Sequence, residues 1–172
     1  MQFLRSAQIE DIGAITAIYR HHVLTGFASF EEIPPSETDM ASRMAAILDR
    51  GLPYLCLEVT EPATDRPHVV GYAYAGPYRA RSAYRFTVED SIYLAPGQTG
   101  RGYGGLLLAR LVQDCRALNL REMVAVIGDS ANLASIELHR RQGFAEIGIL
   151  RRVGFKFDRW VDSVLMQLSL QG

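Results

Sequence analysis

A strand, a glycine-rich turn and a helix are predicted, in that order, by the stretch Thr87-Val-Glu-Asp-Ser-Ile-Tyr-Leu-Ala-Pro-Gly-Gln-Thr-Gly-Arg-Gly-Tyr-Gly-Gly-Leu-Leu-Leu-Ala-Arg-Leu-Val-Gln-Asp-Cys115. Val88, Ile92 and Leu94 favour the strand, and apolar residues at helical spacing follow from Leu107 onward. The glycines of the turn leave few Cβ atoms, so another group can approach the backbone closely. Unpaired N–H groups and the positive end of the helix dipole meet at this turn. The stretch therefore predicts an anion site, for which phosphate is the usual occupant.

Three interpretations of the turn remain open at this point. The P-loop signature is missing, because no Lys-Ser or Lys-Thr follows the glycines. Gly100-x-Gly102-x-x-Gly105 satisfies the dinucleotide fingerprint, which requires an opening βαβ unit and a later acid, for which Asp129 is the candidate. A turn that binds nothing is the third interpretation.

Composition restricts the classes of protein. The 172 residues, 48% hydrophobic and 22% charged, predict one ordered domain that spans 1–172. The net charge of −1 predicts no general attraction to nucleic acid or to a membrane surface. No apolar run approaches the length of a membrane span, and the segment that follows Met1 lacks the apolar core of a secretory signal.

The cysteines and histidines give no metal signature. Cys56 and Cys115 lie in apolar stretches, which predicts buried free thiols and a cytoplasmic location. No pair of Cys or His has ligand spacing beside a second pair, so we expect no metal. His21 and His22 are expected on a helix face.

The patterns along the chain predict the order β-α-α-β-β-β-α-β-α-β-β. The expected strands are 3–6, 54–60, 69–75, 85–94, 123–127, 144–153 and 160–170. The expected helices are 9–25, a segment that starts after Ser36 and stops at Gly51, the helix that follows the turn, and 132–142, and 61–67 is expected to be a hairpin loop. This order predicts a mixed α/β sheet that has an antiparallel first half and a parallel pairing in the middle, flanked by helices.

Three features of the chain resemble the GNAT superfamily of acetyl-CoA-dependent N-acetyltransferases. Thr99-Gly-Arg-Gly-Tyr-Gly104 is similar to the superfamily's Gln/Arg-x-x-Gly-x-Gly/Ala pyrophosphate loop, although Thr99 stands where Gln or Arg is frequent. Asn132-Leu-Ala-Ser-Ile-Glu-Leu-His-Arg-Arg-Gln-Gly-Phe144 is similar to its Asn-x-x-Ser…Gly-Phe helix. The order of strands and helices is the third feature. The resemblance implies a GNAT-like mixed sheet and acetyl-CoA as co-substrate.

One branch, the phosphinothricin and methionine-sulfone N-acetyltransferases, is more similar still. Its substrate segment resembles Tyr74–Glu89, and its later strands resemble Val124–Gly128 and Val153–Asp162. The resemblance implies acetylation of the α-amine of a small amino-acid-like substrate, of the phosphinothricin, methionine sulfone or methionine sulfoximine type. It also implies a homodimer, because this branch commonly forms one.

Transfer of an acetyl group from a thioester to an amine requires a neutral amine, a polarised carbonyl and a protonated thiolate. An α-amine has a pKa of about 8, so a base must remove its proton. The resemblance places that base at Glu89, either directly or through water; the alternative is a counter-ion that only orients the ammonium. His139 stands where many members have a Tyr that protonates the thiolate, and structural packing is the alternative.

The resemblance assigns further site residues. Those predicted to bind acetyl-CoA are Ile92, Tyr93, Leu94, Gly100, Arg101, Gly102, Tyr103, Gly104, Gly105, Asn132 and Ser135. Those predicted to bind the amine are Phe30, Arg79, Arg81, Tyr84, Glu89, Asp90 and Ser91. The backbone N–H groups near Tyr93 and Leu94 would polarise the carbonyl.

Several of these assignments have a structural alternative. Asn132 would contact the pantetheine arm, or else act only as a helix cap. Arg79 and Arg81 would hold the substrate's oxyanions, or else be solvated surface arginines. Phe30, Tyr84 and Trp160 would wall the pocket, with core packing as the default.

Two other functions remain open. The first is acetylation of a protein N-terminus or lysine, which requires an open groove; paired arginines at 79 and 81 suit a small anion better. The second is a non-catalytic acyl-CoA-binding module, against which the presence of Glu89 and Asn132 argues.

Overall fold

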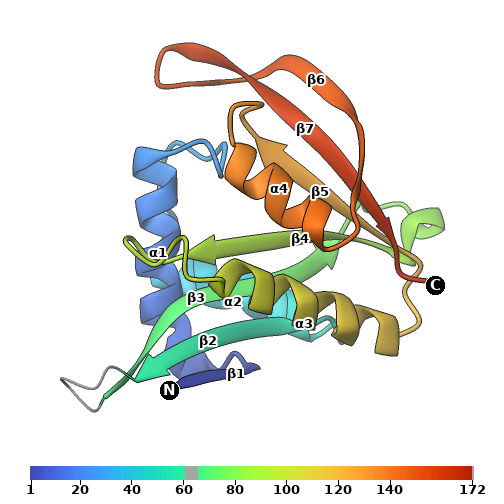
Figure 1. Ribbon diagram of the computed structural model, residues 1–172. Helices are drawn as coiled ribbons and strands as arrows, with labels where there is room; N and C mark the ends of the chain where they lie inside the picture. The colour runs from blue at the N-terminus through green and yellow to red at the C-terminus, as the bar shows by residue number, and fades with distance from the viewer. Residues whose placement is uncertain (61–65, 172) are drawn as a thin grey trace.

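The computed structural model describes residues 1–60 and 66–171. A seven-stranded sheet with the order β1-β2-β3-β4-β5-β7-β6 forms the centre of the molecule (Figure 1). Its strands are β1 Gln2–Ser6, β2 Tyr54–Thr60, β3 Pro67–Pro77, β4 Thr87–Leu94, β5 Glu122–Gly128, β6 Ala145–Lys156 and β7 Arg159–Ser169. The pairing of β4 with β5 is parallel and the other pairings are antiparallel. This confirms the predicted fold class; most of the expected hairpin loop 61–67 lies outside the described residues.

Helices cover both faces of the sheet. They are α1 Ile12–Thr25, α2 Glu37–Leu48, α3 Tyr103–Ala117 and α4 Leu133–Arg141, with short 3-10 helices η1 Ile9–Asp11 and η2 Ser82–Tyr84. In Figure 1, α3 and α4 lie in front of the sheet and α2 lies behind it. Side chains alternate between the two faces of a strand. Leu55 and Leu57 of β2 therefore join the core beneath α3, whereas Tyr54 and Cys56 join the core beneath α1 and α2.

The boundaries of several elements differ from the expectation. The fourth strand begins at Thr87, not Arg85, because η2 occupies the chain immediately before it. The first helix is preceded by a 3-10 turn at Ile9–Asp11, where the Asp11 carboxylate accepts the backbone N–H of Gln8 at 2.7 Å. The strand expected to end at Val153 continues to Lys156, across an irregularity in register between Leu150 and Gly154.

Two other expectations, the capping box at Ser36 and the buried free cysteines, are confirmed. Ser36 caps α2 in a capping box, in which its side chain accepts the N–H of Asp39 at 3.1 Å. Both cysteines are buried and free. None of the described helices is both long and apolar enough to cross a membrane.

The feature that positions the site is the separation of β4 from β5. Their ladder contains only Thr87 to Glu89 against Glu122 to Val124. Beyond it, β4 remains paired with β3 as far as Leu94, and β5 remains paired with β7 as far as Gly128. The facing edges of the two strands therefore diverge, and their backbone N–H and C=O groups have no ladder partner on that side.

Candidate active site

A cavity of about 590 Å³ occupies the divergence between β4 and β5. Most of its wall comes from five parts of the chain: the loop after α1, β4 from Glu89 to Leu94, the turn before α3, β5 from Ala125 to Gly128, and α4. The loop after α1 comes from the first third of the sequence and α4 from the last third, so the site exists only in the folded chain.

The turn before α3 presents backbone to this cavity. Gly100 and Gly102 have φ angles of +76° and +82°, a left-handed conformation that an L side chain rarely adopts. The first N–H that bonds within the helix belongs to Leu106, which donates to the carbonyl of Gly102 at 3.2 Å. The preceding N–H groups are free of intrahelical partners, and they add to the positive end of the helix dipole. The arrangement suits a phosphate or pyrophosphate group.

Glu89 lies on the face of the sheet that α1 and α2 cover. The alternation along β4 fixes this position, because Val88 joins the core beneath α3 and Tyr93 joins the core on the other face. Burial raises the pKa of Glu89, the charge of Asp90 raises it further, and Arg79 opposes the shift. A carboxylate whose pKa is raised is a better proton acceptor at neutral pH than an ordinary Glu.

Asp90 and His139 form a buried pair on the opposite face. His139 Nε2 lies 3.0 Å from Asp90 Oδ2, and His139 Nδ1 donates to the backbone carbonyl of Ser135 at 2.7 Å. Burial would lower the pKa of His139, but the hydrogen bond and charge of Asp90 and the Ser135 carbonyl raise it above its ordinary value. Both ring nitrogens face acceptors, which favours the charged imidazolium, and the pair joins α4 to β4. The other oxygen of Asp90, Oδ1, is buried without a hydrogen-bond partner among the described residues.

Asn132 caps α4. Its side-chain oxygen accepts the backbone N–H of Ser135 at 3.2 Å, and both residues line the cavity. The helix cap that was the structural alternative for Asn132 is therefore present. It does not exclude the predicted contact with pantetheine, because the cap uses only the amide oxygen and leaves the amide NH₂ as a donor.

The structure brings most of the predicted site residues together. Those that line the cavity are Phe30, Glu89, Asp90, Ser91, Ile92, Tyr93, Leu94, Gly100, Gly102, Tyr103, Gly104, Gly105, Asn132, Ser135 and His139. Arg79, Arg81, Tyr84 and Arg101 are exposed and stand outside the set of described residues that line it. Arg79 is nevertheless close enough to Glu89 to affect its pKa.

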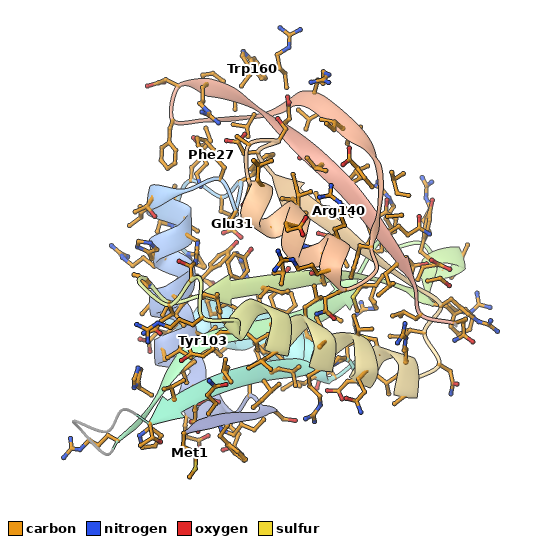
Figure 2. The ribbon with its side chains drawn as sticks, in the orientation of Figure 1. Met1, Phe27, Glu31, Tyr103, Arg140 and Trp160 are labelled. Atoms are coloured by element: carbon orange, nitrogen blue, oxygen red, sulfur yellow. The ribbon has the colours of Figure 1, made fainter. Side chains whose placement is uncertain are left out.

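The default expectation that Phe30, Tyr84 and Trp160 pack in the core is wrong. Trp160 is 62% exposed near the tip of the β6–β7 hairpin, at the top of Figure 2. Tyr84 is also exposed, and its ring meets that of Tyr78 edge-on. Phe30 is the one of the three that walls the cavity. Sequence could not separate them, because an aromatic residue next to a turn packs wherever the fold brings a partner.

Residues without a role predicted from the sequence also line the cavity. His22 of α1 donates through Nε2 to the carbonyl of Leu94 at 2.8 Å, and burial lowers the pKa of its ring, which favours the neutral form. The edge of β5 from Ala125 to Gly128 and Ser163 of β7 complete the wall. The similarity of Val124–Gly128 to the branch was the signal available for β5. No group of three or more His, Cys, Asp or Glu among the described residues could hold a metal.

The chain belongs to the acetyltransferase (GNAT) family, since the family's sequence profile matches residues 15–144. This membership removes the dinucleotide interpretation of the turn, and Asp129 instead forms an ion pair with Arg159.

Within the family, the chain is similar to phosphinothricin N-acetyltransferase of Alcaligenes faecalis, with 52% identity over 167 residues that cover 97% of this chain and 82% of the relative. It is 41% identical to the L-methionine sulfoximine/L-methionine sulfone acetyltransferase of Pseudomonas paraeruginosa, over 97% of this chain and 94% of the relative. A crystal structure of a phosphinothricin acetyltransferase from Sinorhizobium meliloti, in complex with acetyl-CoA, superposes with a TM-score of 0.90 at 46% identity and covers 98% and 88% of the two chains. An acetyltransferase from Salmonella typhimurium, with acetyl-CoA, has a TM-score of 0.92 at 36% identity and covers 99% and 94%.

Proposed function

We propose that this protein transfers the acetyl group of acetyl-CoA to the α-amine of a small amino-acid-like substrate, of the phosphinothricin, methionine sulfone or methionine sulfoximine type. The observation that carries the proposal is the cavity between the diverging strands, where the glycine turn before α3 and the half-buried carboxylate of Glu89 are brought together. The relatives named above act on such substrates, and two structural neighbours bind acetyl-CoA.

Acetyl-CoA would bind with its pyrophosphate at the turn 100–105 and its pantetheine arm in the opening. The arm carries amide groups, and the unpaired edges of β4 and β5 offer backbone donors and acceptors to them. Asn132 would donate to the arm through its NH₂ group, and Ser135 lies beside it. The thioester carbonyl would then reach the N–H groups near Tyr93 and Leu94, which stabilise a developing oxyanion.

Glu89 would prepare the amine. In the proposed step, its carboxylate takes a proton from the substrate ammonium, directly or through water, and the neutral nitrogen attacks the thioester carbon. A tetrahedral intermediate forms and collapses when the C–S bond breaks. The products are the amide and the CoA thiolate, which requires a proton.

His139 is the proposed source of that proton. Asp90 and the Ser135 carbonyl raise its pKa above the ordinary value, which favours the charged ring that a proton donor requires. Glu89 and His139 belong to opposite faces of the sheet, so a thioester held between the strands has an acceptor on one side and a donor on the other. Donation to sulfur requires Nε2 to exchange its contact with Asp90 for the thiolate, which would leave the Ser135 contact intact.

The substrate carboxylate would be held by Arg79 and Arg81. Both arginines are exposed, and Arg79 is close enough to Glu89 for its charge to lower the pKa of that carboxyl group. Arginine's planar fork binds carboxylate, phosphinate and sulfone oxygens well. Asp90 and Ser91, predicted with this group, lie in the cavity itself.

We propose that the protein is a homodimer. The β6–β7 hairpin projects from the body of the molecule (Figure 1) and exposes Ile147, Leu150, Val153, Phe155, Phe157 and Trp160. Exposed apolar surface of this extent is typical of an interface. Sedimentation analysis at micromolar concentration should give twice the chain mass of 19.1 kDa; a monomer would contradict the proposal. We also propose a cytoplasmic location, in keeping with the two free cysteines.

A panel of amines with acetyl-CoA tests the proposed function, with release of free thiol as the readout. The panel contains phosphinothricin, L-methionine sulfone, L-methionine sulfoximine, L-methionine, and a peptide with a free N-terminal alanine. Rapid turnover of one of the three oxyanion-bearing amino acids is expected. Preference for the peptide would overturn the small-substrate proposal. If no amine of the panel causes release of free thiol, a non-catalytic module becomes the better hypothesis.

A further inference from the structure

Lys156 is the sole lysine of the chain, and it is buried, with 1% of its surface exposed. It ends β6 at the tip of the hairpin. Its ammonium donates to the backbone carbonyl of Gly26 at 2.8 Å and to that of Ser29 at 2.6 Å. Burial lowers the pKa of Lys156, and the charges of Glu32 and Glu31 oppose the shift. A buried ammonium is costly unless its hydrogen bonds are satisfied, and here two acceptors come from one distant loop.

That loop joins α1 to α2 and lines the cavity with Phe27, Ala28, Ser29 and Phe30. Side chains of α1 and α2 also hold this loop. The Tyr19 hydroxyl of α1 meets Ser29 Oγ at 2.8 Å and donates to Glu31 at 2.9 Å. Arg43 of α2 forms an ion pair with Glu31 at 2.6 Å. Lys156 supplies a further anchor from the hairpin, so α1, α2 and the hairpin all hold the loop, of which Figure 2 labels Phe27 and Glu31.

The loop packs closely against two glycines, Gly154 of β6 and Gly128 of β5. A Cβ atom at Gly154 would lie 2.4 Å from the Phe30 ring. A Cβ atom at Gly128 would come within 1.9 Å of the Phe27 carbonyl oxygen. The Phe27 ring also meets Phe157 edge-on at 5.5 Å, and the Arg159 guanidinium lies over it at 4.2 Å.

The turn at the hairpin tip is strained. Phe157 and Asp158 have φ angles of +50° and +56°, which non-glycine residues adopt only at a cost. Such a turn persists where the surroundings hold it in place, and here Lys156 and Phe157 are held by the loop. The hairpin tip and the loop therefore constrain each other.

We infer that Lys156 is a positioning residue for the amine substrate. Its ammonium fixes the two loop carbonyls, and this sets the place of Phe30 in the wall of the cavity on the amine side. The turn that is proposed to bind acetyl-CoA lies on other elements, so the effect of Lys156 falls on the amine and not on the co-substrate. The identity of the affected ligand rests on the proposed function.

Lys156→Met tests the inference, because Met keeps the length of the side chain and removes the donors. The KM for L-methionine sulfone should rise by about tenfold or more, while the KM for acetyl-CoA stays within about twofold. Arg151→Met is the matched control: it removes a cation from an exposed position on the same strand, and it should leave both constants unchanged. An unchanged KM for the amine, or equal increases in both constants with a lower Tm, would overturn the inference.

Gly154→Ala provides a second variant in case Lys156→Met does not fold. Its methyl group displaces the Phe30 ring without touching the charge of Lys156. The same separation of the two KM values is expected, and an unchanged KM for the amine would contradict the role given to Phe30 and to its anchor.

A readout independent of activity comes from the single lysine. Protein grown with [15Nζ]lysine should give one ammonium resonance, visible near neutral pH because buried, hydrogen-bonded protons exchange slowly with water. Addition of L-methionine sulfone should shift this resonance, whereas acetyl-CoA should shift it little. A resonance lost to fast exchange, or one that responds to acetyl-CoA alone, would overturn the inference. If the wild-type protein acetylates none of the amines, the proposed function fails while the resonance still tests the anchor.

Discussion

The two sides of the opening between β4 and β5 present different groups to a ligand, backbone on one side and side chains on the other. The side toward α3 presents the backbone of the turn 100–105, where Gly100 and Gly102 have left-handed φ angles. The side toward α1 and α2 presents side chains, among them Glu89 and Phe30, supported by the buried ammonium of Lys156. A backbone site binds any phosphate of the right shape, whereas a side-chain site can be altered one residue at a time. Changes of substrate within this fold are therefore expected on the second side.

The largest effect that separates the two sides is expected for Glu89→Gln. This change keeps the shape and removes the proton acceptor, so kcat should fall by roughly 10²–10⁴-fold while the KM for acetyl-CoA is unchanged. In the wild type, kcat/KM for the amine should fall as the pH drops through the raised pKa of Glu89, and the variant should lack this step.

The stability of Glu89→Gln provides its control. A carboxyl group whose folded-state pKa is raised favours folding when protonated and disfavours it when charged. The Tm of the variant at pH 7 should therefore not be below that of the wild type. A kcat within about twofold of the wild type across the alkaline range would leave Glu89 only as an ammonium contact.

The next largest effect is expected for Asp90→Asn, which should lower the free energy of unfolding. Removal of one partner from a buried pair costs about 3 kcal/mol or more, because the remaining charge stays buried. Because folding raises the pKa of His139, its charged ring contributes to the free energy of unfolding. This contribution is fully present below the unfolded-state pKa and is lost as the pH rises through the folded-state pKa. The difference in Tm between wild type and variant, measured by calorimetry, should thus be larger near pH 6 than near pH 9. An equal difference at both pH values would show that the imidazolium is not the stabilised form.

Gly102→Val addresses the backbone side. The left-handed φ of +82° costs an L residue about 1–2 kcal/mol, and more if it is β-branched, so the turn should rearrange. The KM for acetyl-CoA should rise by about tenfold or more. Gly51→Val is the matched control, since Gly51 has a similar φ of +69° and lies at the end of α2; it should lower Tm without changing this KM. A wild-type KM in Gly102→Val would remove the turn from the acetyl-CoA site.

The smallest effect is expected for Arg81→Ala. Arg81 is exposed, and an exposed ion pair is worth no more than about 1 kcal/mol, so the KM for the amine should rise only several-fold and less at high salt. Arg85→Ala, in the same exposed segment, should leave that KM unchanged. If neither Arg81→Ala nor Arg79→Ala alters it, the small-anion pocket is wrong and a protein substrate becomes the better hypothesis.

The sequence by itself determined what depends on neighbouring residues. The turn before α3, the capping box at Ser36, and the order of strands and helices follow from local spacing, because glycine, cap and apolar period act over a few residues. The alternation along β4 also separates Glu89 from Asp90 onto opposite faces.

Only the tertiary structure decided which distant groups meet. The pair of Asp90 with His139, the bond from His22 to the Leu94 carbonyl, and the anchor of Lys156 join residues that are 49, 72 and about 130 positions apart. No local pattern encodes these contacts, because each depends on how two separately formed elements pack. The same reason explains why Trp160 is at an exposed tip and Phe30 in the cavity: both are aromatic residues near turns, and only the packing of the hairpin against the loop distinguishes them.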